Sequence, residues 1–206
     1  MKKFSMLLLI ILFYYVGGNA ADSNNSILIN ASYLLTTGEE DLNNTMGFGF
    51  LYNRNFTDKL SLSTGLYYFS PSNEANNLPS GNIKLLPIII NGNYTFGGET
   101  FYPYISAGLS YFILNYSLSS DTIKAFDELG FDLSSSADNS LGFNIGGGTY
   151  IKLNTKYDLI IDVRYFNASS TISATIKERV TQLQNEKSIN ISLNSIAISG
   201  GIKFNF

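Results

Sequence analysis

Apolar side chains occupy every second position along most of the chain from residue 26 onward. In the stretch 46–52, for example, Met46, Phe48 and Phe50 alternate with glycine and leucine. A period of two is typical of β-strands with one apolar face. Eight segments follow this pattern, at 27–33, 46–52, 60–68, 86–96, 103–113, 141–151, 159–165 and 196–206. Each spans roughly the 9–11 residues of a tilted transmembrane strand, which predicts an all-β fold, an eight-stranded antiparallel up-and-down transmembrane barrel.

The positions between the apolar ones are small or polar, as at Gly65, Asn91, Gly108, Gly146 and Ser199. A soluble sandwich also alternates, with its polar face in water. It has no reason to place so much glycine on that face. The interior of an eight-stranded barrel is only wide enough for side chains to fill it, which favours small residues there.

The connections between the segments alternate in length. Short connections fall near 57–59, 97–100 and 154–156, and long ones at 36–45, 70–82, 115–139 and 167–188. Tight periplasmic turns and longer outer loops are typical of outer-membrane barrels. This layout places the start of the barrel and Phe206 on the periplasmic side. The third long connection predicts a short helix near 121–129, ended by Gly130.

The first twenty residues have the pattern of a secretory signal peptide. Lys2 and Lys3 precede an apolar run at 6–16, and Gly18 and Ala20 supply small residues before a cut after Ala20. A buried N-terminal helix is the alternative. We therefore expect a signal peptide at 1–20 and a barrel at 21–206. The longest later apolar run, 85–90, is too short for a membrane helix, so residence in a membrane requires a closed barrel.

Charge and composition exclude several classes of function. The segment from residue 21 carries 11 basic and 16 acidic residues, a net charge of −5, which argues against nucleic-acid binding. The chain contains no Cys and no His. The families of barrel proteases, phospholipases, lipid A deacylases and palmitoyl transferases use a catalytic His. We therefore expect no enzyme activity, no metal site and no cofactor.

Aromatic residues of the apolar face gather near the ends of the segments. Such girdles are typical of side chains at the two membrane–water interfaces, although aromatics also favour strands in general. The expected periplasmic girdle comprises Tyr52, Tyr94, Phe96, Phe204 and Phe206, and the expected outer girdle Tyr33, Tyr68, Tyr111 and Tyr165.

Three stretches resemble a known family. They are LPIIINGNYTF at 86–96, FYPYISAGLSY at 101–111 and AISGGIKFNF at 197–206. They are similar to the small barrels of the outer-membrane protein W family. The resemblance implies eight strands in the bacterial outer membrane, in contact with its lipid. It also implies a terminal aromatic, here Phe206, that is read by the barrel-assembly machinery, and a proposed route for small hydrophobic molecules.

The inner face of the predicted barrel divides by height. Its periplasmic half is polar, with residues such as Tyr104, Tyr150, Asp158 and Lys203. Its outer half gathers apolar side chains that we predict to be the ligand site: Leu34, Tyr67, Phe69, Ile89, Phe112, Phe166 and Leu193. A packed core without a ligand is the alternative, because sequence does not give a cavity volume.

The apolar inner lining is expected to continue beyond the membrane without a break in alternation. Ile83 and Leu85 would extend the fourth strand, Leu114, Tyr116 and Leu118 the fifth, Ile172, Ala174 and Ile176 the seventh, and Ile189, Ile191 and Leu193 the eighth. Outward positions there are polar, which indicates a raised vestibule that has left the lipid.

Asp162 and Arg164 share the inner face of the seventh strand. If the tight turns set the register, Asp162 lies opposite Gly148 and Gly201, and Arg164 lies near Gly146 and Ser199. Interior charges must be paired, which predicts a structural ion pair, with a polar gate as the alternative.

Three functions agree with these patterns. The first is a barrel that binds or passes small hydrophobic molecules across the outer membrane. The second is a surface protein whose long hairpins adhere to other cells or to host proteins. The third is a structural barrel with a filled interior.

Overall fold

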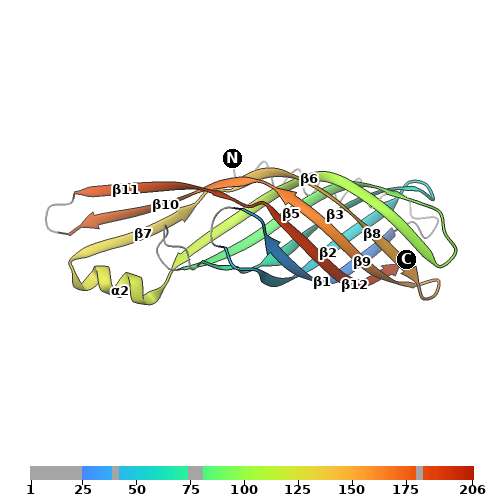
Figure 1. Cartoon of the computed structure of the whole chain (residues 1–206), viewed down its shortest axis with the longest axis horizontal. Helices are drawn as coiled ribbons and strands as arrows, with labels where there is room; N and C mark the ends of the chain where they lie inside the picture. The colour runs from blue at the N-terminus through green and yellow to red at the C-terminus, as the bar shows by residue number, and fades with distance from the viewer. Residues whose placement is uncertain (1–24, 39–41, 74–80, 180–182) are drawn as a thin grey trace.

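The computed structural model describes residues 25–38, 42–73, 81–179 and 183–206. The expected signal peptide at 1–20 lies outside these ranges. Eight long antiparallel strands form a closed barrel, as the alternation predicted (Figure 1). They are β1 (Asn25–Thr36), β2 (Thr45–Asn55), β3 (Leu60–Phe69), β5 (Gly81–Thr95), β6 (Phe101–Leu118), β8 (Ser140–Lys152), β9 (Tyr157–Asn167) and β12 (Ser195–Asn205).

Closure joins the first and last strands. The strand order is β3-β2-β1-β12-β9-β8-β6-β5, and β3 also pairs with β5, so the sheet returns to itself. The backbone N–H of Phe206 donates to the carbonyl of Asn25 at 2.9 Å, and the Asn25 N–H donates back at 3.3 Å. A closed sheet leaves no open edge in the lipid, where an unpaired backbone group is costly.

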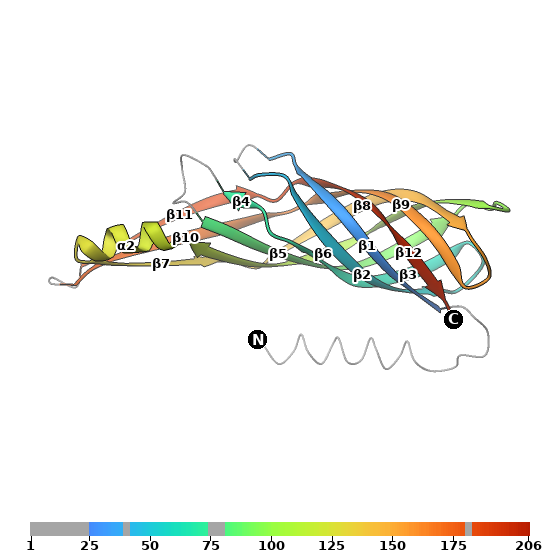
Figure 2. The same cartoon turned by 90° about the horizontal axis from the view of Figure 1, so that it is seen from below.

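The short turns and the C-terminus lie at one end of the barrel, and the long connections lie at the other (Figures 1 and 2). Side chains in two of the turns satisfy nearby backbone donors. Thr57 Oγ1 accepts from the N–H of Leu60 at 2.9 Å, and Asn154 Oδ1 accepts from the N–H of Lys156 at 2.8 Å. Such turn residues pre-organise tight hairpins, which explains why these connections could be recognised in the sequence.

The outward face is apolar, and aromatic pairs lie near its ends. Phe48 stacks on Tyr68 with ring centroids 5.4 Å apart. Tyr94 meets Phe96 at 5.2 Å. These side chains form a lipid-facing surface on strands whose inward positions are buried.

Beyond the membrane-spanning part the molecule continues as a second, smaller assembly. The strands β7 (Phe131–Ala137), β10 (Ser169–Glu178) and β11 (Gln184–Ser192) form a three-stranded sheet in the order β11-β10-β7. A short strand, β4 (Ser72–Asn73), pairs with the outer end of β5. Figure 1 shows this sheet projecting from the barrel, with the helix α2 (Ser120–Glu128) beside it.

The helix forms where the sequence placed it. Ser119 caps its N-terminus by accepting from the N–H of Thr122 at 3.2 Å, and Gly130 follows its end with φ 83°. That left-handed backbone is easily adopted by glycine, which ends the helix. No helix in the described ranges is long and apolar enough to span a membrane.

The expectation of unbroken strands holds for β5 and β6 but is wrong for the seventh and eighth strands. β9 ends at Asn167 and β10 begins at Ser169, while β11 ends at Ser192 and β12 begins at Ser195. β7 and β8 are likewise separated by 138–139. We call this line of three interruptions, at 138–139, 168 and 193–194, the seam. Above it β10 pairs with β7 on one side and with β11 on the other.

The register prediction was right on one side of β9 and wrong on the other. Asp162 lies opposite Gly148, and Arg164 opposite Gly146, as the tight β8–β9 turn dictates. On β12, however, Asp162 faces Ser199 and Arg164 faces Ala197, a shift of two residues from expectation. No tight turn joins β9 to β12, because β10 and β11 intervene, so the register between them is set by barrel closure.

Candidate functional site: the barrel lumen and the wall beside it

The seven predicted ligand-site residues meet in the upper lumen. Leu34 comes from β1, Tyr67 and Phe69 from β3, Ile89 from β5, Phe112 from β6 and Phe166 from β9, while Leu193 lies in the seam. All seven side chains are buried, none more than 4% exposed. We call them the apolar cluster.

Three aromatic contacts hold the cluster together. Tyr67 stacks with Phe69 at 6.0 Å between ring centroids. Phe166 is met edge-on by Tyr67 at 6.1 Å and by Phe112 at 5.9 Å. Offset and edge-to-face arrangements at these distances are favourable for aromatic rings. The rings of the cluster therefore contact one another rather than lining an open tube.

Glycines on the neighbouring strand make room for these rings. A Cβ on Gly47 would lie 2.4 Å from the ring of Phe69, and one on Gly49 would lie 2.6 Å from the ring of Tyr67. The glycines that stood out in the alternation thus face large aromatic side chains across the β2–β3 pair. Their absence of a side chain is what allows two rings on β3 to fit inside a barrel of eight strands.

The apolar lining continues outward, as expected. Ile83 and Leu85 on β5 and Leu114 and Tyr116 on β6 are buried. On the opposite side Ile172 of β10 and Ile191 of β11 are buried too, although Ala174, Ile176 and Ile189 are only partly covered. The vestibule lining therefore survives the interruption of the strands, because inward-facing positions keep their phase on both sides of the seam.

Below the apolar cluster lies a charged layer. The Arg164 Nη2 atom is 3.3 Å from Asp162 Oδ2, and both side chains are buried. The Tyr104 hydroxyl donates to Asp162 Oδ2 at 2.5 Å, and Arg164 Nη1 donates to Asn144 Oδ1 at 2.7 Å. The interior charges are thus paired with each other and held by neutral polar side chains, as buried charges require.

A second polar layer closes the periplasmic end. Lys203 Nζ is 3.5 Å from Asp158 Oδ2 and 4.3 Å from the ring centroid of Tyr150. Asp158 also accepts from Asn205 Nδ2 at 3.0 Å, and Tyr150 stacks on Tyr104 at 4.6 Å. The two layers are joined by this tyrosine pair, so polar side chains cross the lower lumen from wall to wall.

Sequence reasoning missed three apolar residues in the lower lumen. Leu28, Leu51 and Ile160 face inward and are buried. Leu28 pairs with Leu51 across β1 and β2. Each sits between two outward apolar residues, so its position in the alternation pointed it inward, but the unbroken apolar stretch hid it among its neighbours. The lower half is therefore mixed rather than wholly polar.

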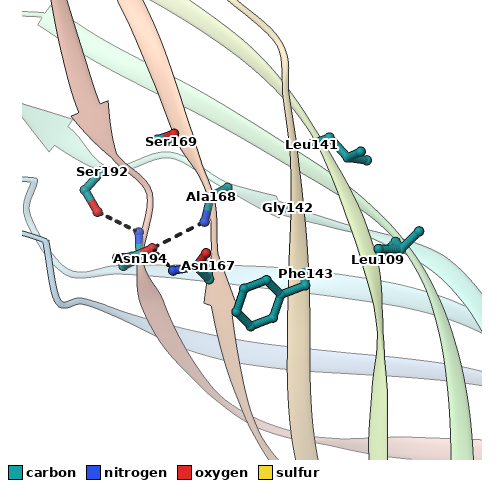
Figure 3. Close-up of a pocket in the computed structure, with 9 residues that line it drawn as sticks. All are labelled: Leu109, Leu141, Gly142, Phe143, Asn167, Ala168, Ser169, Ser192 and Asn194. Carbon is teal, nitrogen blue, oxygen red and sulfur yellow. Dashed lines mark hydrogen bonds between the residues drawn. The ribbon is translucent and has the colours of Figure 1, made fainter.

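A depression of about 490 Å³ marks the outside of the wall at the seam (Figure 3). It is lined by Leu109, Leu141, Gly142, Phe143, Asn167, Ala168, Ser169, Ser192 and Asn194. The leucines and Phe143 are exposed on the lipid-facing side. Asn194 Oδ1 accepts from Asn167 Nδ2 at 2.9 Å and from the Ala168 N–H at 3.3 Å. The Asn194 side chain therefore accepts hydrogen bonds of the kind that the backbone of a paired strand accepts elsewhere in the barrel.

Phe206 lies at the periplasmic rim, with its side chain exposed and its backbone bonded to Asn25. Its role as an assembly signal stays a prediction. If it holds, deletion of Phe206 lowers the yield of inserted protein more than Asn205→Ser does, as measured in outer-membrane fractions.

Comparison with known proteins gives a consistent result. A model of the OmpW family matches residues 16–206. The outer membrane protein OprG of Pseudomonas aeruginosa is 19% identical with a TM-score of 0.72, and the match covers 89% of this chain and 96% of that one. E. coli outer membrane protein W is 18% identical with a TM-score of 0.56, over 89% and 98%. Neisserial surface protein A is 16% identical with a TM-score of 0.61, over 91% and 100%.

No curated protein matches the chain. These three solved structures, each below 25% identity, support the fold, and the family match covers nearly the whole sequence. The closed eight-stranded barrel, its apolar outer face and the family match together place the protein in the bacterial outer membrane, and the chain belongs to the OmpW family.

Proposed function

We propose that this barrel binds small hydrophobic molecules in its upper lumen and releases them sideways into the membrane. The observation that carries the proposal is the apolar cluster directly above the Asp162–Arg164 layer. An apolar molecule that enters from outside meets an apolar lining first and a charged barrier second. The family resemblance, which implies a route for hydrophobic molecules, supports the same direction.

The downward path is unfavourable for physical reasons. An apolar molecule passing the charged layer would separate Arg164 from Asp162 and leave buried charges without partners. Breaking a buried ion pair in this way costs several kcal/mol. The second layer, at Lys203 and Asp158, repeats the obstacle.

The sideways path leads through the seam. The β8–β9 ladder ends at Phe143 and Asn167, and the β9–β12 ladder ends at Phe166 and Ser195. Above these ends strand pairing resumes at Ser169 with Ser192 and at Ile172 with Ala137, so the interruption is short. It is bridged by single bonds, such as that from the Leu193 N–H to the Ala168 carbonyl at 2.9 Å. The depression lies outside this stretch, with apolar side chains toward the lipid. A short opening of the seam would connect the cluster to the membrane.

The packing of the cluster favours a second candidate, the filled structural barrel. The seven side chains are almost fully buried against one another, so a ligand must displace some of them. Aromatic rings that turn aside on binding would accommodate a ligand, whereas a rigid core would not. Binding to the purified protein distinguishes the two.

The test compares Phe112→Asp with Asn115→Asp on the same strand. Phe112 is buried in the cluster, whereas Asn115 is exposed beyond the membrane, so the two variants add the same charge in different places. Calorimetric titration of the refolded barrel in amphipol with decane is expected to show binding by the wild type and Asn115→Asp. Phe112→Asp should lose it, because a buried unpaired charge is expensive. Equal decane binding by both variants, or no binding by the wild type, would contradict a ligand site in the apolar cluster. The filled structural barrel would then be favoured.

A further inference from the structure

Several enclosed polar atoms at the floor of the apolar cluster have no partner at the distance and angle of a full hydrogen bond. Within the described residues these include both amide atoms of Asn30, Oδ1 of Asp162 and Nε of Arg164. The three side chains are at most 3% exposed. More than nine in ten buried polar groups have a partner, so three incompletely satisfied residues in one layer require an explanation.

Tyr67 connects these atoms to the cluster above. Its ring packs against Phe69 and Phe166, while its hydroxyl interacts with the side chains of Asn30 and Arg164. The amide oxygen of Asn30 and the ring of Tyr67 lie over the same glycine, Gly49, within 2.3 Å and 2.6 Å of where its Cβ would be. The incompletely satisfied layer is therefore in direct contact with the floor of the proposed binding region.

The layer offers hydrogen-bond donors and acceptors in equal number. Arg164 Nε and Asn30 Nδ2 are donors, whereas Asp162 Oδ1 and Asn30 Oδ1 are acceptors. The ion pair between Asp162 and Arg164 carries no net charge. A carboxylate placed here would face Asp162, and an ammonium would face Arg164. A hydroxyl, which donates once and accepts twice, suits both halves of the layer.

We propose that the apolar cluster and this polar layer form one site for a neutral amphiphile. The apolar tail lies among Phe69, Phe112 and Phe166, and a hydroxyl head reaches Asn30 and the free atoms of the ion pair. The inference rests on the proposed function and narrows it, because a plain alkane would leave the polar atoms without partners. Since an enclosed polar atom without a partner destabilises the empty barrel, a head that supplies partners adds affinity.

Binding requires movement of Tyr67. Its ring contacts the cluster and its hydroxyl contacts the layer, so a chain that joins the two zones along this side displaces the ring. The ring is held in place by its aromatic contacts, and a bound chain of ten carbons can replace these with apolar contacts of its own. The Tyr67 side chain therefore links the apolar cluster to the polar layer, and a ligand of sufficient length can displace it.

The experiment uses the full barrel in amphipol and four probes of equal length: decane, 1-decanol, decanoate and decylamine. Calorimetric titration of the wild type is expected to give at least tenfold tighter binding of decanol than of decane, and weaker binding of both charged probes. In Asn30→Leu, which keeps the size of the side chain and removes both amide atoms, the decanol-to-decane ratio should fall toward one.

Ser26→Ala is the matched control. Ser26 lies on the inner face of the same strand, is equally buried and also has an unpartnered hydroxyl, but it sits at the periplasmic end. Its decanol-to-decane ratio should match that of the wild type. Folding of each variant is checked by the gel shift of the unheated barrel. If Asn30→Leu does not insert, Asn30→Ala removes the same two atoms and carries the same expected ratio.

The outcomes separate this inference from the proposed function. Equal affinity for decane and decanol in the wild type, or an unchanged ratio in the Asn30 variants, would overturn the hydroxyl site and leave the apolar site standing. Tighter binding of decanoate than of decanol would overturn it in favour of an anion site. Failure of all four probes to bind would remove both proposals together.

Discussion

The two halves of the lumen are built from the same strands but are held together by different forces. On β9, Asp162 and Arg164 lie in the lower half, and Phe166, two residues on, lies in the upper half. The lower half relies on ion pairs and hydrogen bonds of fixed geometry, whereas the upper half relies on contacts among apolar rings. Directional bonds resist displacement, and aromatic packing can rearrange. Closure of the lower lumen and the proposed binding in the upper lumen are thus separated by height within one barrel.

The largest expected effect comes from breaking the lower half at Arg164. In Arg164→Leu the Asp162 carboxylate stays buried without its partner, which should reduce the free energy of unfolding by about 3–5 kcal/mol. Urea titration of the barrel refolded into phospholipid vesicles measures this loss.

The double variant Arg164→Leu with Asp162→Leu removes both charges and should recover most of the stability. If it is as unstable as the single variant, the loss comes from altered packing and not from the unpaired charge. Planar-bilayer recordings of the double variant and of the wild type test whether the lumen is closed. A large, stable conductance in the wild type would contradict a lumen closed by the Asp162–Arg164 layer.

A somewhat smaller effect is expected in the upper half from Ile89→Ala. Ile89 is fully buried, so the variant loses apolar burial and creates a cavity, at a cost of about 2–5 kcal/mol. Ile90→Ala on the same strand is the control, because Ile90 faces lipid, which can fill the vacated space. Vesicle urea titrations should rank the two in this order, and an equal loss would mean that the upper lumen is already loosely packed.

The cavity in Ile89→Ala also tests whether the upper half of the lumen adapts to a ligand. If the upper half adapts to ligands, this variant should bind decane at least as tightly as the wild type despite its lower stability. Weaker decane binding by Ile89→Ala would show that Ile89 makes an essential contact with the ligand.

The smallest stability effect is expected at the seam, which borders the upper half. Asn194→Ala removes the acceptor for the Ala168 N–H and for Asn167 Nδ2, so the free energy of unfolding should fall by about 1–2 kcal/mol. Hydrogen exchange of the Ala168 amide should rise relative to that of Ile161, which lies lower on β9. Equal protection of both amides in the variant would argue against an opening at the seam.

Much of the architecture follows from local properties of the sequence. The period of two located all eight barrel strands and assigned Phe112 and Ile89 to the inner face, because successive strand residues point to opposite sides. Turn residues marked the short connections, and Gly130 marked the end of the helix. The inward glycines Gly47 and Gly49 indicated a narrow interior, since only small residues leave room there for large ones.

The tertiary structure alone decided the rest. Alternation is the same on both sides of the seam, so it cannot show that β9 and β12 stop there and that β10 continues in a separate sheet between β7 and β11. Leu28 was missed because its neighbours in the chain are apolar too. β7 was missed because it is short, with only Phe131, Leu133 and Ala137 as apolar residues on its more covered face. The pairing of Asp162 with Ser199 was likewise decided by closure of the whole barrel. Periodicity fixes the face a residue occupies, whereas register and strand ends depend on partners distant in the chain.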